Sequence, residues 1–280
     1  MNKVPMSVVV ITKNEEEHIA ECLASASWAD ELVVLDDNSS DNTVKLAKQF
    51  TDKVFTRKMD IEGRHRNYAY SLARNNWVLS LDADERVTPE LAEELRGLFS
   101  PSAGSGLTTG EAERVKKPMN DKAYTIPIRA YIGSRWIRHS GWYPAAKVRL
   151  FDKRSFKYEE AEVHPRVFID GSCGHLTKDI IHYSYKDYNE FFVSLNNQTT
   201  LEAKKWLKER RKINFLQMYR KSLSRLLKGY VQKGGFKDGL LGFTISWAGA
   251  LYQFMSYVKY KEMLYNEGQG SRGQGPEKHG

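Results

Sequence analysis

Two carboxylates separated by one small residue follow an apolar run in the first third of the chain. The run covers residues 77–81 and is followed by Asp82, Ala83 and Asp84. Such a run is typical of a buried strand in a parallel sheet, and acids directly after it would stand at the edge where open α/β sheets bind ligands. Asp82 and Asp84 would both face that edge, because alternate strand residues point to the same side. Two carboxylates beside a phosphate suit Mg²⁺ or Mn²⁺. A charged turn gives the same local pattern, so the rest of the chain decides.

Two earlier apolar runs also end in polar residues. The run at residues 6–11 stops at Thr12-Lys13-Asn14-Glu15, and the run at residues 32–35 stops at Asp36 and Asp37. Both runs consist mainly of Val, Ile and Leu, which is typical of central parallel strands. The second run would deliver its carboxylates to the edge that already holds Asp82. The sequence therefore predicts a polar site at one edge of a sheet.

The elements that would position these side chains alternate regularly along the first 85 residues. An amphipathic helix is expected at residues 19–26, because apolar residues recur there at helical spacing. Further helices are expected at residues 42–50 and from Gly63 onward, where helix start signals are present. A short strand is expected at residues 54–55, and another helix from Pro89 to Leu98. Strands that alternate with helices predict an α/β fold with a right-handed, doubly wound, mostly parallel sheet.

Composition indicates a globular chain with one basic segment. The 280 residues are 41% hydrophobic and 28% charged, enough for one large domain or a domain with an appendage. Twelve Lys and Arg face a single acid between residues 203 and 237, so this segment carries +11 and the remainder 8 − 11 = −3. A segment of this kind favours an anionic lipid surface or nucleic acid as a neighbour. The two cysteines are expected to be reduced, and the first residues lack the pattern of a secretory signal, so we expect a cytoplasmic protein.

The second half holds two further clusters. Aromatic rings such as Trp136, Trp142 and Tyr143 occur among Arg, His and Lys, a mixture found both in sugar sites and in protein cores. A stretch of titratable residues at 159–165 is the place to look for a general base, although a solvated acidic loop has the same composition. For His182, which follows two Ile residues, we expect a structural role.

Four motifs in order resemble glycosyltransferase family 2, whose members are inverting enzymes of the GT-A fold, a Rossmann-like architecture, that use nucleotide sugars. Within that family the second half is similar to the lipopolysaccharide core glycosyltransferases. The four motifs are residues 8–15, residues 34–43, Arg66-Asn67 and residues 77–85, and the second-half matches are residues 141–144, 149–151, 163–164 and 182–185.

The resemblance implies roles for the residues at the first two strand ends. Thr12, Asn14 and Glu15 would line the nucleotide pocket. Asp36, together with Asp37, would accept a hydrogen bond from the uracil N3–H of a UDP-sugar, which a fixed carboxylate can do.

The same resemblance assigns the phosphate side of the site. Arg66 and Asn67 would help to hold the base or the phosphates. Asp82 would contact the ribose or the metal, and Asp84 would ligate the Mg²⁺ or Mn²⁺ ion that bridges the two phosphates. The metal would stabilise the charge that grows on the departing diphosphate.

Inversion needs one base that takes the proton of the acceptor hydroxyl. We rank Glu162 first, then His164 and Glu160. The chain departs from its relatives here, because Pro165 stands where they usually carry Glu and Ala145 where they often carry Asp. A catalytically inactive, transferase-like scaffold therefore remains an alternative.

The chain is expected to divide into a catalytic domain, a basic helical extension and a disordered tail. The expected segments are a GT-A catalytic domain at 1–200, made of a nucleotide-binding half at 1–99, a mobile loop at 100–122 and an acceptor half at 123–200; a basic amphipathic membrane-associating region at 201–267; and a tail at 268–280.

The composition of the helical extension indicates which partners the protein could bind. Phe215, Tyr219 and Leu223 recur at helical spacing among Arg and Lys, which favours an anionic membrane surface. Residues 239–258 carry no charge, and interfacial insertion or packing against the preceding helix is expected rather than a span. The leading hypothesis is transfer of a hexose from a UDP-linked donor to a lipid-anchored saccharide such as lipopolysaccharide core, by a protein bound peripherally to the inner face of the cell membrane. Transfer to a polyprenyl phosphate and nucleic-acid binding through the basic segment are the alternatives; no nucleic-acid motif accompanies that segment.

Overall fold

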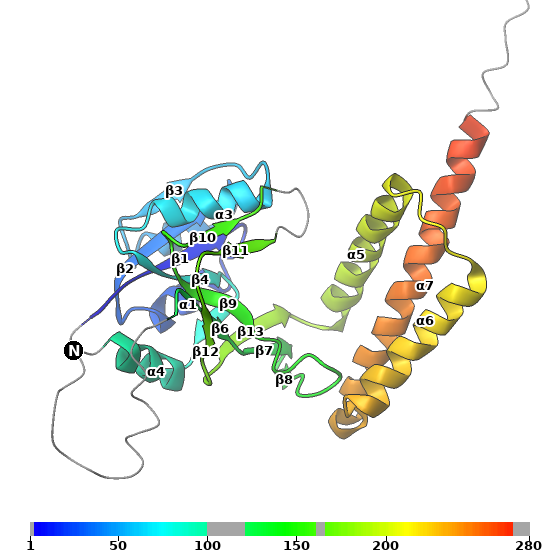
Figure 1. Ribbon diagram of the computed structural model, residues 1–280. Helices are drawn as coiled ribbons and strands as arrows, with labels where there is room; N and C mark the ends of the chain where they lie inside the picture. The colour runs from blue at the N-terminus through cyan, green and yellow to red at the C-terminus, as the bar shows by residue number, and fades with distance from the viewer. Residues whose placement is uncertain (1–2, 100–120, 161–165, 271–280) are drawn as a thin grey trace, which may run out of the picture. The chain divides into compact units, whose positions relative to one another are not determined.

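The computed structural model describes residues 3–99, 121–160 and 166–270, and within them two compact units (Figure 1). The first unit contains the described residues up to 129 and residues 144–183; the second contains residues 130–143 and those from 184 onward. Strands β7 (Ile128–Ile132) and β13 (Ile180–Tyr185) begin in the first unit and end in the second.

The first unit is built on a seven-stranded sheet in the order β12-β6-β9-β4-β1-β2-β3. Every neighbouring pair is parallel except the two that involve β9, which runs antiparallel to β4 and to β6. The expected α/β fold with a mostly parallel sheet is confirmed. The strands of this unit are β1 (Val4–Thr12), β2 (Ala29–Asp36), β3 (Val54–Thr56), β4 (Trp77–Asp82), β5 (Glu85–Val87), β6 (Ala123–Ile126), β9 (Lys147–Asp152), β10 (Phe156–Tyr158), β11 (Val167–Ile169) and β12 (Cys173–His175), and its helices are α1 (Ile19–Ser25), α2 (Thr43–Ala47), α3 (Glu62–Ser71) and α4 (Pro89–Phe99).

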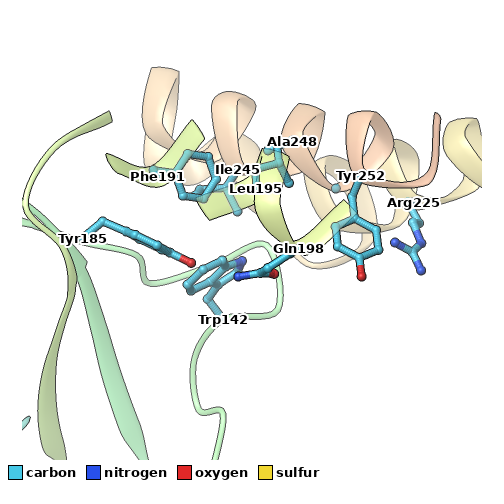
Figure 2. A pocket seen from close by; sticks show the side chains of 10 residues that line it. Trp142, Tyr185, Phe191, Leu195, Gln198, Arg225, Ile245, Ala248 and Tyr252 are labelled. Atoms are coloured by element: carbon cyan, nitrogen blue, oxygen red, sulfur yellow. The ribbon is translucent and has the colours of Figure 1, made fainter. Parts of the chain in front are cut away.

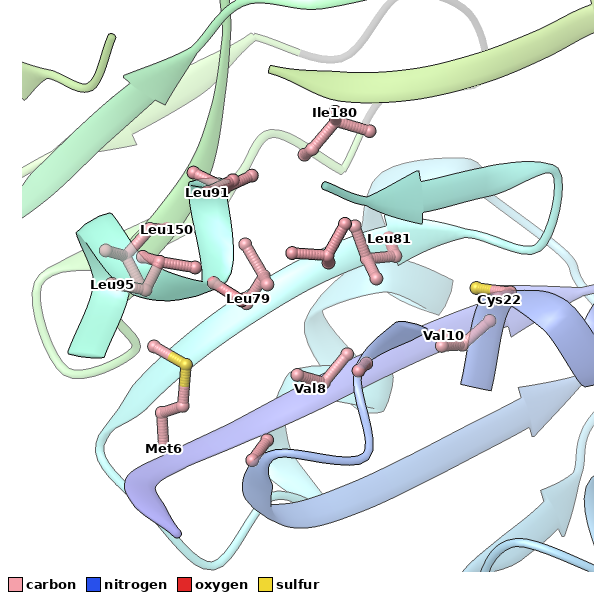
Figure 3. Close-up of a cluster of buried hydrophobic side chains, with 14 of the residues drawn as sticks. Met6, Val8, Val10, Cys22, Leu79, Leu81, Leu91, Leu95, Leu150 and Ile180 are labelled. Carbon is pink, nitrogen blue, oxygen red and sulfur yellow. The ribbon is translucent and has the colours of Figure 1, made fainter. Parts of the chain in front are cut away.

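Both faces of the central strands are buried. Val8, Val9 and Val10 of β1 are fully covered, as a continuous β-branched run predicts. Figure 3 shows one face, where Val8 and Val10 pack with Leu79 of β4 and with side chains of α1 and α4. Burial of each such aliphatic side chain stabilises the fold by about 1.5–3 kcal/mol. This core fixes β1 and β4 against each other and so fixes the position of the residues at their ends.

The other face of the sheet is packed by aromatic rings. Phe151 of β9 stacks on Phe156 of β10 with ring centroids 3.7 Å apart, and Tyr70 of α3 meets Phe151 edge-on at 4.9 Å. The Tyr70 hydroxyl lies 2.9 Å from Ser80 Oγ, which satisfies both buried groups. Helix α3 is thereby held over the strands that carry the acidic ends.

The strand order identifies the ligand-binding edge. Reading outward from β1, the chain proceeds to β2 and β3 on one side and to β4 on the other. The carboxyl ends of strands at such a switch point form the crevice of open α/β sheets. Thr12 closes β1, Asp36 closes β2 and Asp82 closes β4, so the sheet itself brings together the ends that carry the predicted site.

In the second unit, α7 lies between α5 and α6 (Figure 1). Asp187 caps α5 by accepting a hydrogen bond from Glu190 N at 2.8 Å, and Asn214 and Gln217 form a capping box at the start of α6. Trp206 of α5 is buried against Tyr260 of α7. The elements of this unit are β8 (Arg135–Trp136), α5 (Tyr188–Lys208), α6 (Phe215–Leu227), the π-helical turn η2 (Lys228–Gln232), the 3-10 turn η3 (Gly235–Asp238) and α7 (Gly239–Gly270).

Several element boundaries differ from those expected. Helix α5 runs through residue 200, where we placed a domain boundary, because Thr199 and Ala203 are both buried on one continuous face. Helix α2 ends at Ala47 rather than near residue 50, and α7 continues to Gly270, past the expected start of the tail at residue 268. Most of the expected loop at 100–122 lies outside the described residues, but Lys122 N donates to Ser172 O at 2.9 Å. The described helices include none that combines the length and the apolar character needed to cross a membrane.

Candidate active site

A pocket of about 350 Å³ lies in the first unit at the ends of β1 and β4. Six of the predicted site residues line it: Thr12, Glu15, Asp37, Arg66, Asp82 and Asp84. Side chains that were not predicted complete the lining. These include Lys13, Met59, Glu62, His65 and His182.

Asp82 is held between two guanidinium groups. Its Oδ2 accepts from Arg149 Nη2 at 2.7 Å, and its Oδ1 lies 3.4 Å from both terminal nitrogens of Arg66. Burial opposes the charged carboxylate, but the charges of Arg149 and Arg66 outweigh it and lower the pKa of Asp82 well below its usual range. Asp82 is therefore a fixed anion at the pocket wall.

Arg149 also contacts Glu85, which is completely buried on β5. Glu85 accepts in turn from Asp82 N at 3.0 Å. Burial raises the pKa of Glu85, and the nearby charge of Asp82 adds to that effect, while Arg149 opposes it. Burial disfavours the charged guanidinium, yet Asp82 and Glu85 together raise the pKa of Arg149 well above its usual value. One cation thus serves two carboxylates, and it is itself only 4% exposed.

Asp84 forms the second charged contact of the pocket. Its Oδ2 lies 2.9 Å from His182 Nε2, and β13 brings His182 to this place by pairing antiparallel with β5. Both side chains are about a quarter exposed, at 24% and 23%. Burial would lower the pKa of His182, but the hydrogen bond and charge of Asp84 and the charge of Glu85 outweigh it and raise the pKa. The pair faces the same pocket as Asp82.

The donor set at Asp84 fits a divalent ion that binds together with a ligand. Asp84 offers a carboxylate and His182 an imidazole, whereas both oxygens of Asp82 already face guanidinium groups. No cluster of three or more His, Cys, Asp or Glu side chains suited to a metal occurs in the described part of the chain. Mg²⁺ and similar ions commonly take one or two protein ligands and complete their shell with phosphate oxygens and water. The geometry favours Asp84 over Asp82 as a ligand.

The loop after β1 is held in shape by the loop after β2. Asn14 adopts a left-handed conformation, with φ 52°, and its Oδ1 accepts from Ser40 N at 2.8 Å. Asp36 is 1% exposed, accepts from Ser39 N at 2.9 Å and does not line the pocket. Asp37 does line it, and accepts from Lys13 Nζ at 2.9 Å and from Met59 N at 2.7 Å. Burial opposes its charge, but these two donors lower the pKa of Asp37. Asn14 and Asp36 thus shape the loops, and Asp37 is presented to a ligand.

Two polar side chains in the pocket are buried without a hydrogen-bond partner among the described residues. They are Thr12, through Oγ1, and His65, through both ring nitrogens. Burial and the charge of Arg57 lower the pKa of His65, which favours the neutral imidazole. Buried polar atoms in native structures nearly always have partners. Both side chains therefore stand at the pocket wall with hydrogen-bonding capacity that the described residues do not use.

Arg66 and Asn67, which are adjacent in sequence, differ in what they touch. Arg66 faces Asp82 and also contacts Glu62 at 3.0 Å. Asn67 lies outside this pocket: its Nδ2 donates to Tyr158 O and its Oδ1 accepts from Tyr158 N, both at 2.9 Å. Asn67 thus binds β10 to α3, and a direct contact with base or phosphate remains a prediction.

Of the three candidate bases, only Glu160 lies within the described residues. Its side chain is 45% exposed and accepts from Arg64 Nε at 3.1 Å. Glu162 and His164 fall at 161–165, outside the described residues, and their roles stay predictions.

Comparison with known families decides the class of protein. The family model for glycosyl transferase family 2 matches residues 7–159, which is more than half of the chain. The chain belongs to glycosyltransferase family 2. The expected family is confirmed, and the match covers β1, β4 and the acidic strand ends of this glycosyltransferase.

Relatives of similar length carry glycosyltransferase names. The lipopolysaccharide core biosynthesis glycosyltransferase LpsC of Rhizobium meliloti is 23% identical over 92% of this chain and 92% of its own length. An uncharacterized glycosyltransferase of Rickettsia typhi is 25% identical over 92% of this chain and 87% of its own. Among solved structures, S. aureus TarS residues 1–349 in complex with UDP is 13% identical, with a TM-score of 0.42, over 96% of this chain and 92% of that one.

Sequence reasoning placed Arg149 and His182 in motifs that resemble the family, but it gave Arg149 no role and His182 a structural one. Arg149 lies between Val148 and Leu150 of a buried strand, and an inward charge on such a strand needs a carboxylate partner; that signal was available. For His182 no local signal existed, because its partner Asp84 lies 98 residues earlier and meets it only through the β5–β13 pairing.

Proposed function

We propose that this glycosyltransferase moves a hexose from a UDP-linked sugar to a lipid-linked saccharide such as lipopolysaccharide core, with inversion at the anomeric carbon. One observation carries the donor half of the proposal: the pocket presents Asp37 and Asp84, and among the described residues Thr12 Oγ1 and the His65 nitrogens find no hydrogen-bond partner there. A nucleoside diphosphate offers hydrogen-bonding groups to Thr12 and His65, a base N–H to Asp37 and, through a metal ion, its phosphates to Asp84. The name of the LpsC relative supports the acceptor class.

The proposed metal site consists of Asp84 and His182, with Mg²⁺ or Mn²⁺ as the ion. When bound, the metal would neutralise the charge that develops on the leaving diphosphate. Asp82 would not ligate it. Held by Arg66 and Arg149, Asp82 is a rigid acceptor suited to a ribose hydroxyl. Asp37, which Lys13 and Met59 hold in place, would accept the uracil N3–H, the role that the sequence assigned to Asp36 together with Asp37.

The transfer itself needs one base and no covalent enzyme intermediate. The acceptor oxygen forms a bond with the anomeric carbon while the bond from that carbon to the diphosphate oxygen breaks, and the acceptor proton passes to the base. Glu162 is the first candidate, followed by His164 and Glu160. Replacement of the base by Gln, as Glu162→Gln or His164→Gln, should lower kcat by about 10²–10⁴-fold. Glu160→Gln should lower it far less, because Glu160 already pairs with Arg64.

Calorimetry with UDP in the presence and absence of Mn²⁺ tests the metal pair. Asp84→Asn and His182→Gln should each weaken Mn²⁺-dependent UDP binding by about 10–100-fold and leave metal-free binding nearly unchanged. Asp170→Asn is the matched control, since Asp170 is an exposed carboxylate outside this pocket. Equal Mn²⁺-dependent binding by the parent protein and Asp84→Asn would reject the metal role.

We further propose that the corner between α6 and α7 rests on an anionic membrane surface at the inner face of the cell membrane. Aromatic rings meet there in sequence: the partly buried Tyr230 contacts the exposed Phe236 and Phe243, and Phe243 stacks on the exposed Trp247 at 6.3 Å. Leu240 beside them is 73% exposed. Lys228, Lys233 and Lys237 flank these rings in sequence. Exposed rings next to lysines suit the boundary between acyl chains and anionic headgroups.

Co-sedimentation with vesicles tests the membrane contact. Binding to vesicles that contain phosphatidylglycerol should exceed binding to pure phosphatidylcholine, and Phe243→Ser/Trp247→Ser should lose it. Phe192→Ser is the control, because Phe192 is similarly exposed on α5. Retention on DNA at physiological salt without vesicle binding would favour the nucleic-acid alternative, and a dimer that the double variant abolishes would assign the surface to a second copy of the chain.

A further inference from the structure

The second unit contains a pocket of about 420 Å³ that no part of the proposed donor site uses. It lies among α5, α6, α7 and the loop that carries Trp142. Figure 2 shows Phe191, Leu195 and Ile245 on the helix side, with the polar ends of Tyr185, Gln198 and Tyr252 toward the other side near Trp142. Ring faces and hydrogen-bonding tips therefore alternate around one space of a size typical for small-molecule sites.

Gly249 keeps this space open. It lies in the interior of α7, where glycine is about 1 kcal/mol less favourable than alanine. A Cβ added at Gly249 would meet nothing within 4 Å, whereas at Gly229 or Gly242 of the same unit it would come within 3.0 Å of neighbouring atoms. Packing explains those two glycines and does not explain Gly249. Its missing side chain adds volume to the pocket that it lines.

One positive charge stands at the rim. The guanidinium of Arg225 lies over the ring of Tyr252 at 5.4 Å, and no ion pair among the described residues includes Arg225. The nearby carboxylate of Glu202 interacts with the hydroxyl of Tyr252. It does not pair with Arg225, because it accepts a hydrogen bond from Trp206 Nε1 at 2.6 Å and lies 3.9 Å from Arg211. Arg225 is thus available to an anion that enters the pocket.

We propose that this pocket binds a phosphate-bearing saccharide, with a sugar ring against Trp142 and Tyr185 and the phosphate on Arg225. A saccharide presents C–H faces to rings and hydroxyls to polar tips, and a phosphate pairs with a guanidinium in a fork geometry. An alkyl chain would offer no partner to the guanidinium of Arg225 or to the hydroxyl of Tyr185, which both line the pocket. This inference rests on the proposed function, in which the ligand is the phosphorylated head of the lipid-linked acceptor.

The indole N–H signal of Trp142 in the full-length protein, assigned by its loss in Trp142→Phe, gives a local readout. The probes are glucose 6-phosphate, glucose, inorganic phosphate and dodecyl phosphate. Glucose 6-phosphate should shift the signal saturably, and glucose and inorganic phosphate should each bind at least about 10-fold more weakly, since each lacks half of the contacts. No saturable shift up to about 10 mM, above the millimolar range of weak specific ligands, would overturn the proposal.

Two variants test the residues. Gly249→Leu should abolish binding by filling the pocket, and Arg225→Gln should weaken glucose 6-phosphate at least about 10-fold while changing glucose little. Arg220→Gln is the matched control, an exposed arginine of α6 outside the pocket. Undiminished binding by Gly249→Leu, with its thermal transition intact, would place the ligand elsewhere.

The remaining outcomes separate the source of the phosphate and the two sites. Dodecyl phosphate that binds more tightly than glucose 6-phosphate and is lost in Gly249→Leu would assign the pocket to a lipid phosphate and reject the saccharide. UDP binding by Gly249→Leu should equal that of the parent protein. If UDP fails to bind to either protein, the proposed donor function fails while the glucose 6-phosphate result still decides this pocket.

Discussion

The pocket of the first unit is lined by charges that come in pairs, whereas the pocket of the second unit is lined by rings and holds one guanidinium. Asp37 faces Lys13, Asp84 faces His182 and Asp82 faces Arg149 in the former. In the latter, Arg225 lies over the ring of Tyr252 and has no ion pair with any residue that the structure describes. Paired charges hold their geometry before a ligand arrives, which suits a site that must place a diphosphate. A pocket of rings accepts several orientations of a sugar.

The charged pocket should depend most on Arg149. Arg149→Met leaves the buried Glu85 without its cation and leaves Asp82 with Arg66 alone, so the free energy of unfolding should fall by about 3–5 kcal/mol. Urea unfolding measures it, with Lys157→Met as the control at an exposed lysine of β10. Glu85→Gln in the Arg149→Met background should restore part of the loss. A loss under about 1 kcal/mol would mean that the cluster does not hold the site together.

Asn67 should matter to stability more than to the ligand. Asn67→Ala removes both bonds to the backbone of Tyr158 and should cost about 1–3 kcal/mol. UDP affinity of the folded variant should change by less than about threefold, which corresponds to less than one hydrogen bond. A large loss of UDP affinity at unchanged urea midpoint would return Asn67 to the direct role that its motif implies.

A substitution in the ring-lined pocket of the second unit should raise stability rather than lower it. Gly249→Ala should raise the free energy of unfolding by about 0.5–1 kcal/mol, because alanine favours the helix and meets no neighbour. The same substitution should weaken glucose 6-phosphate through the added methyl group. Destabilisation by alanine would show that Gly249 is required by packing.

The smallest effect concerns acid stability of the first unit. Burial opposes the charge of Glu31, but Lys53, Ser7 and the N–H of Arg74 outweigh it and lower its pKa. A lowered pKa stabilises the fold above the unfolded pKa of about 4.3, and this stabilisation is lost as pH falls through the folded value. Glu31→Gln should therefore flatten the fall of unfolding free energy between about pH 5 and pH 3. Glu93→Gln, at an exposed site of α4, should leave the slope of the parent protein.

Much of the first unit could be predicted because its signals are local. The run of Val8, Val9 and Val10 predicts a strand that is buried on both faces, and the acids after residues 35 and 81 fall where such strands end. The sequence could not predict that Asp37 lines the pocket while Asp36 shapes the loop. This difference arises because Ser39 binds the carboxylate of Asp36, whereas Lys13 binds that of Asp37. The β5–β13 pairing that brings His182 to Asp84 is equally invisible in either segment alone.

The second unit was harder to predict for a physical reason. Helical spacing in residues 215–230 correctly indicated an amphipathic helix, and α6 begins at Phe215. The pocket beside it needs Trp142, Gln198, Arg225 and Gly249, which lie on four separate segments and meet only when α7 packs between α5 and α6. Trp142 belongs to the aromatic cluster visible in the sequence, whereas Gly249 is one of several glycines in the uncharged stretch 239–258, and its meaning depends on empty space that the sequence does not show.

The exposed rings where α6 meets α7 also affect how the protein behaves in a test tube. The exposed Phe236, Phe243 and Trp247, together with the partly buried Tyr230, form a contiguous apolar area on the surface of a chain with net charge +8. Such an area draws molecules together when no amphiphile covers it. Purified protein should therefore elute as a broad, concentration-dependent peak in plain buffer and as a sharp monodisperse peak once a mild detergent is added. Its handling in vitro thus depends on a surface that takes no part in the chemistry.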